Sequence, residues 1–185
     1  IVSKPDMRSP EEATLYLQKL KSILFSIGVS DCKMEQGSLR CDGNISVMEK
    51  GSDKFGVRAE IKNVNSFKAL EKAFEYEIDR HIKAIEEGMV LTQETRRWDE
   101  NSGVTVNMRS KEEANDYRYF PEGDLVSLNI SEAWIEEIRK TIPELPHEKA
   151  ERLVKDYGIP KYDAGELTLS AEMADFFDKT AKLCK

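Results

Sequence analysis

Hydrophobic and polar residues alternate strictly through residues 37–48, a pattern that predicts a β-strand with two different faces. The apolar face would carry Leu39, Cys41, Ile45 and Val47, and the polar face Ser38, Arg40, Asp42, Asn44 and Ser46. A second alternating run over residues 55–63 sets Val57, Ala59 and Ile61 against Arg58, Glu60 and Lys62. Together the two strands would form one sheet face that combines carboxylates with cations. Such a face suits a polyanionic, metal-bound substrate, and it is also typical of the solvated side of an antiparallel sheet.

Two amphipathic helices are predicted to cover the apolar side of these strands. The first begins at Ser9, Pro10 and Glu12, which provide an N-cap, a first helical residue and a capping box. The second begins after Ser66. Their apolar stripes are Leu17, Leu20, Leu24 and Ile27 in the first helix and Phe67, Leu70, Phe74, Ile78, Ile82 and Ile85 in the second. His81 falls on the polar side of the second helix, so we expect it to be solvated.

Further along the chain, residues 92–98 and 104–109 predict a β-hairpin around an acidic turn that ends in Gly103. The loop over residues 109–124 is rich in charged and aromatic side chains and has no helical or strand period. It either packs its rings beneath a long connection or holds Asp116 and Arg118 over a site.

The pattern becomes helical after residue 130, with helix starts at Ser131, near His147 and at Ser170. We therefore predict an α+β fold with an antiparallel-rich sheet and packed helices over residues 1–130. Residues 131–185 would then be the beginning of an all-helical domain.

The net charge of −7 and the pI near 5.1 exclude a globally basic, nucleic-acid-binding surface, so any contact with nucleic acid has to be local. No apolar run approaches the roughly 20 residues that a membrane span needs. Cys32, Cys41 and Cys184 lack metal-type spacing, which is typical of reduced cysteines. The missing initiator Met and the uncapped helical pattern at the C-terminal end predict a piece of a longer protein.

Seven motifs follow one another along the chain: PDMRSP (5–10), GVSD (28–31), GSLRCD (37–42), EIKN with NSF (60–67), QETR (93–96), DYRYFP (116–121) and TIPELP (141–146). In this order they resemble the B subunit of glutamyl/aspartyl-tRNA amidotransferase. The resemblance implies a glutamine synthetase-like cradle domain, of which residues 1–130 would be the C-terminal half. The family's N-terminal cradle half and C-terminal tail domain are absent from this sequence. Gly43 stands where the family usually has Ala.

The resemblance also implies a reaction and its partners. The family's complex is a ligase that uses ATP and Mg²⁺ to phosphorylate the side-chain carboxylate of Glu or Asp misacylated on tRNA(Gln) or tRNA(Asn). Ammonia, released from glutamine by a partner amidase subunit, then displaces the phosphate. A small third subunit completes the complex. The chain would be active only within the full-length complex, in a bacterial cytoplasm or an organelle matrix.

Four residues of the predicted polar face fit catalytic roles in that reaction. Arg40 and Lys62 would bind phosphate oxygens, while Asp42 and Glu60 are candidates to hold Mg²⁺. The residues expected to bind or orient the substrate are Ser38, Asn44, Asn63, Asn65, Asp116 and Arg118. The alternative is a non-catalytic scaffold that binds tRNA or other proteins of the complex, which would not need this charge set.

Overall fold

The computed structural model describes residues 1–108 and 122–184, and these residues fall into two compact units. The first unit is drawn from Ile1–Lys19 and Cys32–Tyr117, and the second from Leu20–Asp31 and Arg118–Lys185. Helix α1 (Pro10–Ser26) contributes residues to both. The predicted domain boundary near residue 130 stays a prediction. None of the helices in the described ranges is long and apolar enough to cross a membrane.

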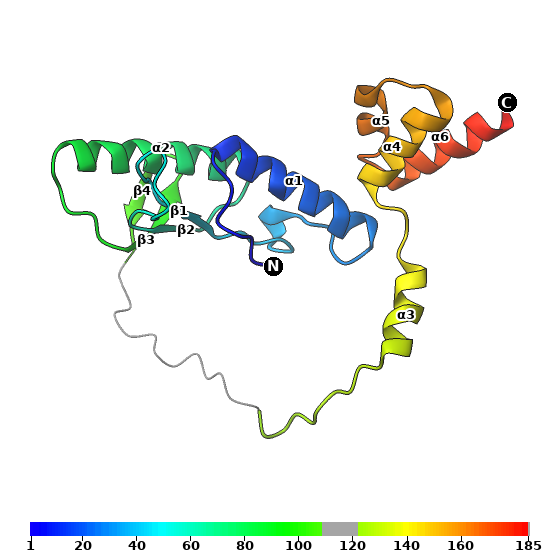
Figure 1. The fold of residues 1–185 in the computed structure, drawn as a ribbon, viewed down its shortest axis with the longest axis horizontal. Helices are drawn as coiled ribbons and strands as arrows, with labels where there is room; N and C mark the ends of the chain where they lie inside the picture. The colour runs from blue at the N-terminus through cyan, green and yellow to red at the C-terminus, as the bar shows by residue number, and fades with distance from the viewer. Residues whose placement is uncertain (109–121, 185) are drawn as a thin grey trace. The chain divides into compact units, whose positions relative to one another are not determined.

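A four-stranded sheet forms the centre of the first unit (Figure 1). Its order is β1 (Gly43–Ile45), β2 (Ala59–Lys62), β3 (Glu94–Asp99) and β4 (Val104–Asn107), and a 3₁₀ turn (Met34–Gln36) precedes β1. The pairs β1–β2 and β3–β4 are antiparallel, as expected, and the predicted hairpin is confirmed. Strands β2 and β3 are parallel because helix α2 (Phe67–Glu86) connects them as a crossover. The result is the predicted α+β class with a mainly antiparallel sheet.

The core of the first unit lies between one face of the sheet and helices α1 and α2. Its buried residues are Ala13, Leu17, Ile61, Val64, Ala69, Leu70, Ala73, Phe74 and Trp98, with Cys41 and Ile45 packed at the edge. Both helices begin as predicted, since Ser9 Oγ accepts from Glu12 N at 3.1 Å and Ser66 Oγ accepts from Ala69 N at 3.0 Å. The inward direction of the predicted apolar face is thus confirmed for Cys41, Ile45, Ala59 and Ile61, although both strands are shorter than the alternation suggested.

Strand β1 passes very close to helix α2 at Gly43. A Cβ atom at this position would lie 2.7 Å from the ring of Phe74 and 2.9 Å from a methyl group of Leu70. The absence of a side chain therefore sets the spacing between the edge of the sheet and the helix.

The second half of α2 presents a different face to the core from the one predicted. Ile82 and Ile85 are 40% and 53% exposed, whereas Glu77 and His81 are almost completely buried. The expectation of a solvated His81 is therefore wrong. Polar side chains on β3 and β4 offer hydrogen-bonding partners here, and this allows the helix to turn polar rather than aliphatic residues inward.

The described part of the second unit contains four helices after residue 130: α3 (Glu132–Thr141), α4 (Pro146–Tyr157), α5 (Lys161–Leu167) and α6 (Ala171–Leu183). The caps Ser131 and Ser170 are confirmed, since their Oγ atoms accept from Trp134 N and Met173 N at 3.2 and 3.3 Å. Helix α5 was not predicted, because seven residues are too few for a clear helical period.

An ion-pair network joins α4 to α6 in this unit. Arg152 on α4 lies 3.2 Å from Asp178 on α6, and the hydroxyl of Tyr157 donates to Asp178 at 2.6 Å. The guanidinium of Arg152, followed by Tyr157 and Lys182, holds the pKa of Asp178 well below its usual range. Arg152 also binds Glu144 at 2.7 Å, so these charges fix the helices to one another.

Candidate functional site

The candidate site is the open face of the sheet, on the side opposite to the one that α2 covers. Because side chains alternate along a strand, Glu60 and Lys62 point away from the core when Ala59 and Ile61 point into it. The strand register sets Asn44 of β1 opposite Glu60. The polar face predicted from the sequence is therefore formed by β1 and β2.

Three of the four predicted catalytic residues come together on this face. The ammonium of Lys62 lies 2.9 Å from the carboxylate of Asp42 and 3.0 Å from that of Glu60. These hydrogen bonds, first the one that Lys62 donates to Asp42 and then the one that it donates to Glu60, raise the pKa of Lys62, so it is a cation at neutral pH. The side chains of Asp42 and Glu60 are 53% and 30% exposed, so an incoming ligand can reach both carboxylates.

The carboxylates of Asp42 and Glu60 converge on a single cation, the ammonium of Lys62. This geometry can be compared with what a metal ion requires. Mg²⁺ accepts one or two protein carboxylates and takes its other ligands from water and phosphate oxygens. Asp42 and Glu60 meet that requirement, and Lys62 supplies the positive charge that balances them in the absence of another cation. Among the described residues, the only group of three or more potential metal ligands close enough to share an ion is formed by Glu11, Glu71 and Glu75 on α1 and α2.

Arg40, the fourth predicted catalytic residue, is exposed and has no hydrogen bond or ion pair within the described ranges. Its guanidinium lies beside Gly37, with Nη2 3.7 Å from the point that a Cβ of residue 37 would occupy. The structure thus brings Asp42, Glu60 and Lys62 into contact, and Arg40 makes no hydrogen bond or ion pair with them.

The predicted substrate-binding residues lie in three different environments. Ser38 Oγ accepts from Lys33 N at 2.9 Å and donates to Lys33 O at 3.1 Å, which closes the turn before β1. Asn63 follows β2 in a left-handed conformation with φ of 60°, and the exposed Asn65 precedes the N-cap of α2. Asp116 and Arg118 lie outside the described residues.

Sequence reasoning did not find a buried polar cluster on the α2 side of the same sheet. Glu77 accepts from Arg80 Nη2 at 2.8 Å and from the hydroxyl of Thr105, and Arg96 Nε lies 3.1 Å from its carboxylate. Burial alone would raise the pKa of Glu77, but hydrogen bonds from His81, Arg80 and Thr105 lower it to about 2. The sequence did contain a signal for this cluster. By alternation along β3 and β4, Arg96 and Thr105 fall on the face opposite to that of their direct neighbours in each strand.

His81 also belongs to this cluster, and its contacts there account for its burial. Its Nε2 atom lies 3.1 Å from Nη2 of Arg80 and 3.5 Å from Oε2 of Glu77. Within the described part of the chain, Nδ1 of His81 is buried without a hydrogen-bonding partner. The cluster connects α2 to β3 and β4 and so supports the sheet from behind the open face.

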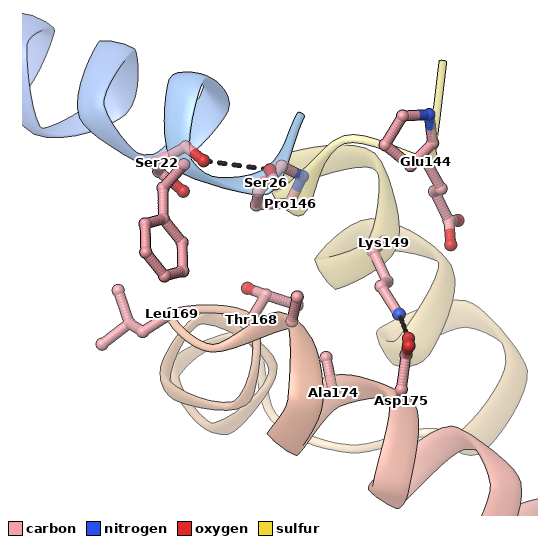
Figure 2. Close-up of a pocket in the computed structure, with 12 residues that line it drawn as sticks. Ser22, Ser26, Glu144, Pro146, Lys149, Thr168, Leu169, Ala174 and Asp175 are labelled. Carbon is pink, nitrogen blue, oxygen red and sulfur yellow. Dashed lines mark hydrogen bonds and ion pairs between the residues drawn. The ribbon is translucent and has the colours of Figure 1, made fainter. Parts of the chain in front are cut away.

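A pocket of about 410 Å³ in the second unit has a different character (Figure 2). It is lined by Ser22, Phe25, Ser26, Pro143, Glu144, Pro146, Lys149, Thr168, Leu169, Ala171, Ala174 and Asp175. Lys149 and Asp175 are ion-paired with each other there, and Arg152 binds Glu144. Since its charged lining residues already have partners, the pocket offers less chemistry than the open face of the sheet.

Comparison with known proteins gives a consistent picture. The pattern of the GatB/GatE catalytic domain family matches residues 1–136. A relative from Clostridium botulinum strain Hall, described as the B subunit of an aspartyl/glutamyl-tRNA(Asn/Gln) amidotransferase, is 76% identical over 181 residues, which are 98% of this chain. One from Clostridium acetobutylicum with the same description, numbered 1, is 73% identical over 183 residues, or 99% of the chain. The chain spans 38% of the length of each relative.

Proposed function

Because the chain belongs to the GatB/GatE catalytic domain family, as its motifs predicted, we propose that its first unit forms part of a phosphoryl-transfer site. The site would phosphorylate the side-chain carboxylate of Glu or Asp misacylated on tRNA(Gln) or tRNA(Asn). Ammonia from a partner amidase subunit would then displace the phosphate, with a small third subunit completing the complex. The description of the relatives as B subunits of an aspartyl/glutamyl-tRNA(Asn/Gln) amidotransferase supports this substrate class.

The observation that carries the proposal is the charge arrangement on the open face. A carboxylate is a poor electrophile, so amidation requires prior activation, and phosphoryl transfer depends mainly on positioning and on neutralising charge. The ammonium of Lys62 lies within 3.0 Å of the carboxylates of both Asp42 and Glu60, on a sheet that is supported from behind. A scaffold that only binds macromolecules has no need for two solvent-accessible carboxylates held around one ammonium.

Each residue of the site has a role that follows from its chemistry. Asp42 and Glu60 would hold Mg²⁺, which with ATP supplies the phosphoryl group when bound. Lys62 would then exchange its carboxylate partners for phosphate oxygens, and Arg40 would add a planar fork for the same anion. Asn44, which faces Glu60 in the register, and the exposed Asn63 and Asn65 would orient the carboxyl group of the substrate.

The amidotransferase complex assembled with this chain tests the proposal through Arg40→Ala. We expect ATP-dependent phosphorylation of the misacylated tRNA to fall by about 10²- to 10³-fold, because a charged phosphate contact is lost in the transition state. Glutamine hydrolysis by the partner amidase should remain largely intact. Phosphorylation is followed with γ-labelled ATP, and glutamate release reports the activity of the amidase.

The matched control is Lys50→Ala, since Lys50 is an exposed cation in the loop between β1 and β2. It should leave both activities unchanged. Phosphorylation at the wild-type rate in Arg40→Ala would remove Arg40 from the site. If Lys62→Ala were also fully active, the chain would be a binding scaffold rather than part of the catalytic machinery.

A further inference from the structure

Strand β3 brings two more polar residues to the open face beside the proposed site. In the parallel pairing of β2 with β3, Thr95 is the neighbour of Glu60 and Arg97 is the neighbour of Lys62. The hydroxyl of Thr95 donates to Oε2 of Glu60 at 3.2 Å, which shows that the two strands share one face here. Arg96 between them points the other way, toward Glu77.

Arg97 differs from its neighbour Lys62 in its ion-pair partners. Lys62 is already bound by two carboxylates, whereas Arg97 is exposed and forms no hydrogen bond or ion pair within the described residues. The pKa of Asp99 is lowered first by a hydrogen bond from the backbone of Asn101, and the charge of Arg97 contributes to the shift. Arg97, like Arg40, is thus a cation whose guanidinium fork is open to an incoming anion.

We propose that Arg97 is a polyphosphate-binding residue of the open-face site. This inference rests on the proposed function and adds a residue from a third strand to it. A guanidinium binds two phosphate oxygens at once, and adjacent strands lie less than about 5 Å apart. Arg97 can therefore act on the same ligand as the cluster of Asp42, Glu60 and Lys62. A triphosphate bridged to Mg²⁺ matches a face on which two carboxylates and two cations lie side by side.

The test measures binding of a non-hydrolysable ATP analogue with Mg²⁺ to the amidotransferase complex assembled with this chain, by calorimetry. Arg97→Ala should weaken the affinity by about 10- to 100-fold, because charge-assisted hydrogen bonds to phosphate are lost. Arg97→Lys should recover part of this loss, since it keeps the charge without the fork. Arg139→Ala is the matched control: Arg139 is an exposed arginine of α3 with an ion-pair partner on its own helix, and affinity should not change.

Lys62→Ala in the same experiment separates this inference from the proposed function. If Lys62→Ala weakens nucleotide binding and Arg97→Ala does not, the proposed function stands and the role of Arg97 is overturned. If neither substitution has an effect, both ideas are overturned. Unchanged nucleotide binding with weaker tRNA binding in Arg97→Ala would identify a contact to the RNA backbone instead, and it too would overturn the inference. The circular dichroism spectrum of each variant confirms that it is folded.

Discussion

The carboxylate of Glu77 is expected to be a major support of the first unit, and Glu77→Gln is the perturbation that tests this. Glutamine keeps the size of the side chain and removes its charge. Two guanidinium groups, those of Arg80 and Arg96, would then share one remaining carboxylate, Glu94, which lies 3.5 and 2.6 Å from them. Removing one partner of a buried ion pair leaves the other charge uncompensated, at a cost of about 3–5 kcal/mol.

The pKa of Glu77 gives an independent measure of how much its charge contributes to the free energy of unfolding. Its lowering from an ordinary 4.5 to about 2 corresponds to about 3 kcal/mol in favour of the charged, folded form. Because the pKa of the folded state is depressed, this stability is present above pH 4.5 and is lost as the pH falls from about 4.5 toward 2. The difference between wild type and Glu77→Gln should therefore be about 3 kcal/mol at pH 7 and about 1 kcal/mol at pH 3.

Urea unfolding followed by tryptophan fluorescence measures this difference. The chain has two tryptophans, so a Trp134→Phe background leaves Trp98, which is buried in the core of the first unit, as the reporter. Asp79→Asn on the exposed side of α2 is the matched control and should change the free energy of unfolding by less than about 0.5 kcal/mol. A difference for Glu77→Gln that is below about 1 kcal/mol at pH 7, or that does not shrink at low pH, would refute the reasoning.

Two further predictions concern the open face and the edge of the sheet. Thr95→Val removes the hydroxyl that holds Glu60 and should weaken Mg²⁺-dependent nucleotide binding by about 3- to 10-fold, whereas Thr95→Ser should restore it. An equal loss in Thr95→Ser, which keeps the hydroxyl, would contradict the assignment of the effect to that hydrogen bond. Gly43→Ala should lower the free energy of unfolding by about 1–3 kcal/mol, because its methyl group meets the ring of Phe74. The loss should be smaller in a Phe74→Leu background, and Gly165→Ala, which has open space around it, is the control; an equal loss in both backgrounds would contradict the packing argument.

The sequence predicted the structure well where one local rule decides it, either a regular alternation of side chains or a capping hydrogen bond. Ser9, Ser66 and Ser170 cap the helices that they were predicted to cap, because capping is a local hydrogen bond that needs no knowledge of the fold. The inward direction of Ala59 and Ile61 also followed from alternation. The burial of Glu77 and His81 could not be predicted in this way, because a polar residue is buried only when distant strands supply its partners.

The same limit explains which part of the open face the sequence revealed. Asp42, Glu60 and Lys62 lie in two clearly alternating runs, so their common face could be inferred before their contacts were known. In β3, alternation sets the consecutive Arg96 and Arg97 on opposite faces, but only the structure shows that one contacts Glu77 while the other lies beside Lys62. Two identical side chains one residue apart thus lie on opposite sides of the sheet and have different environments. One neutralises a buried carboxylate that stabilises the fold, and the other remains open to an anionic ligand.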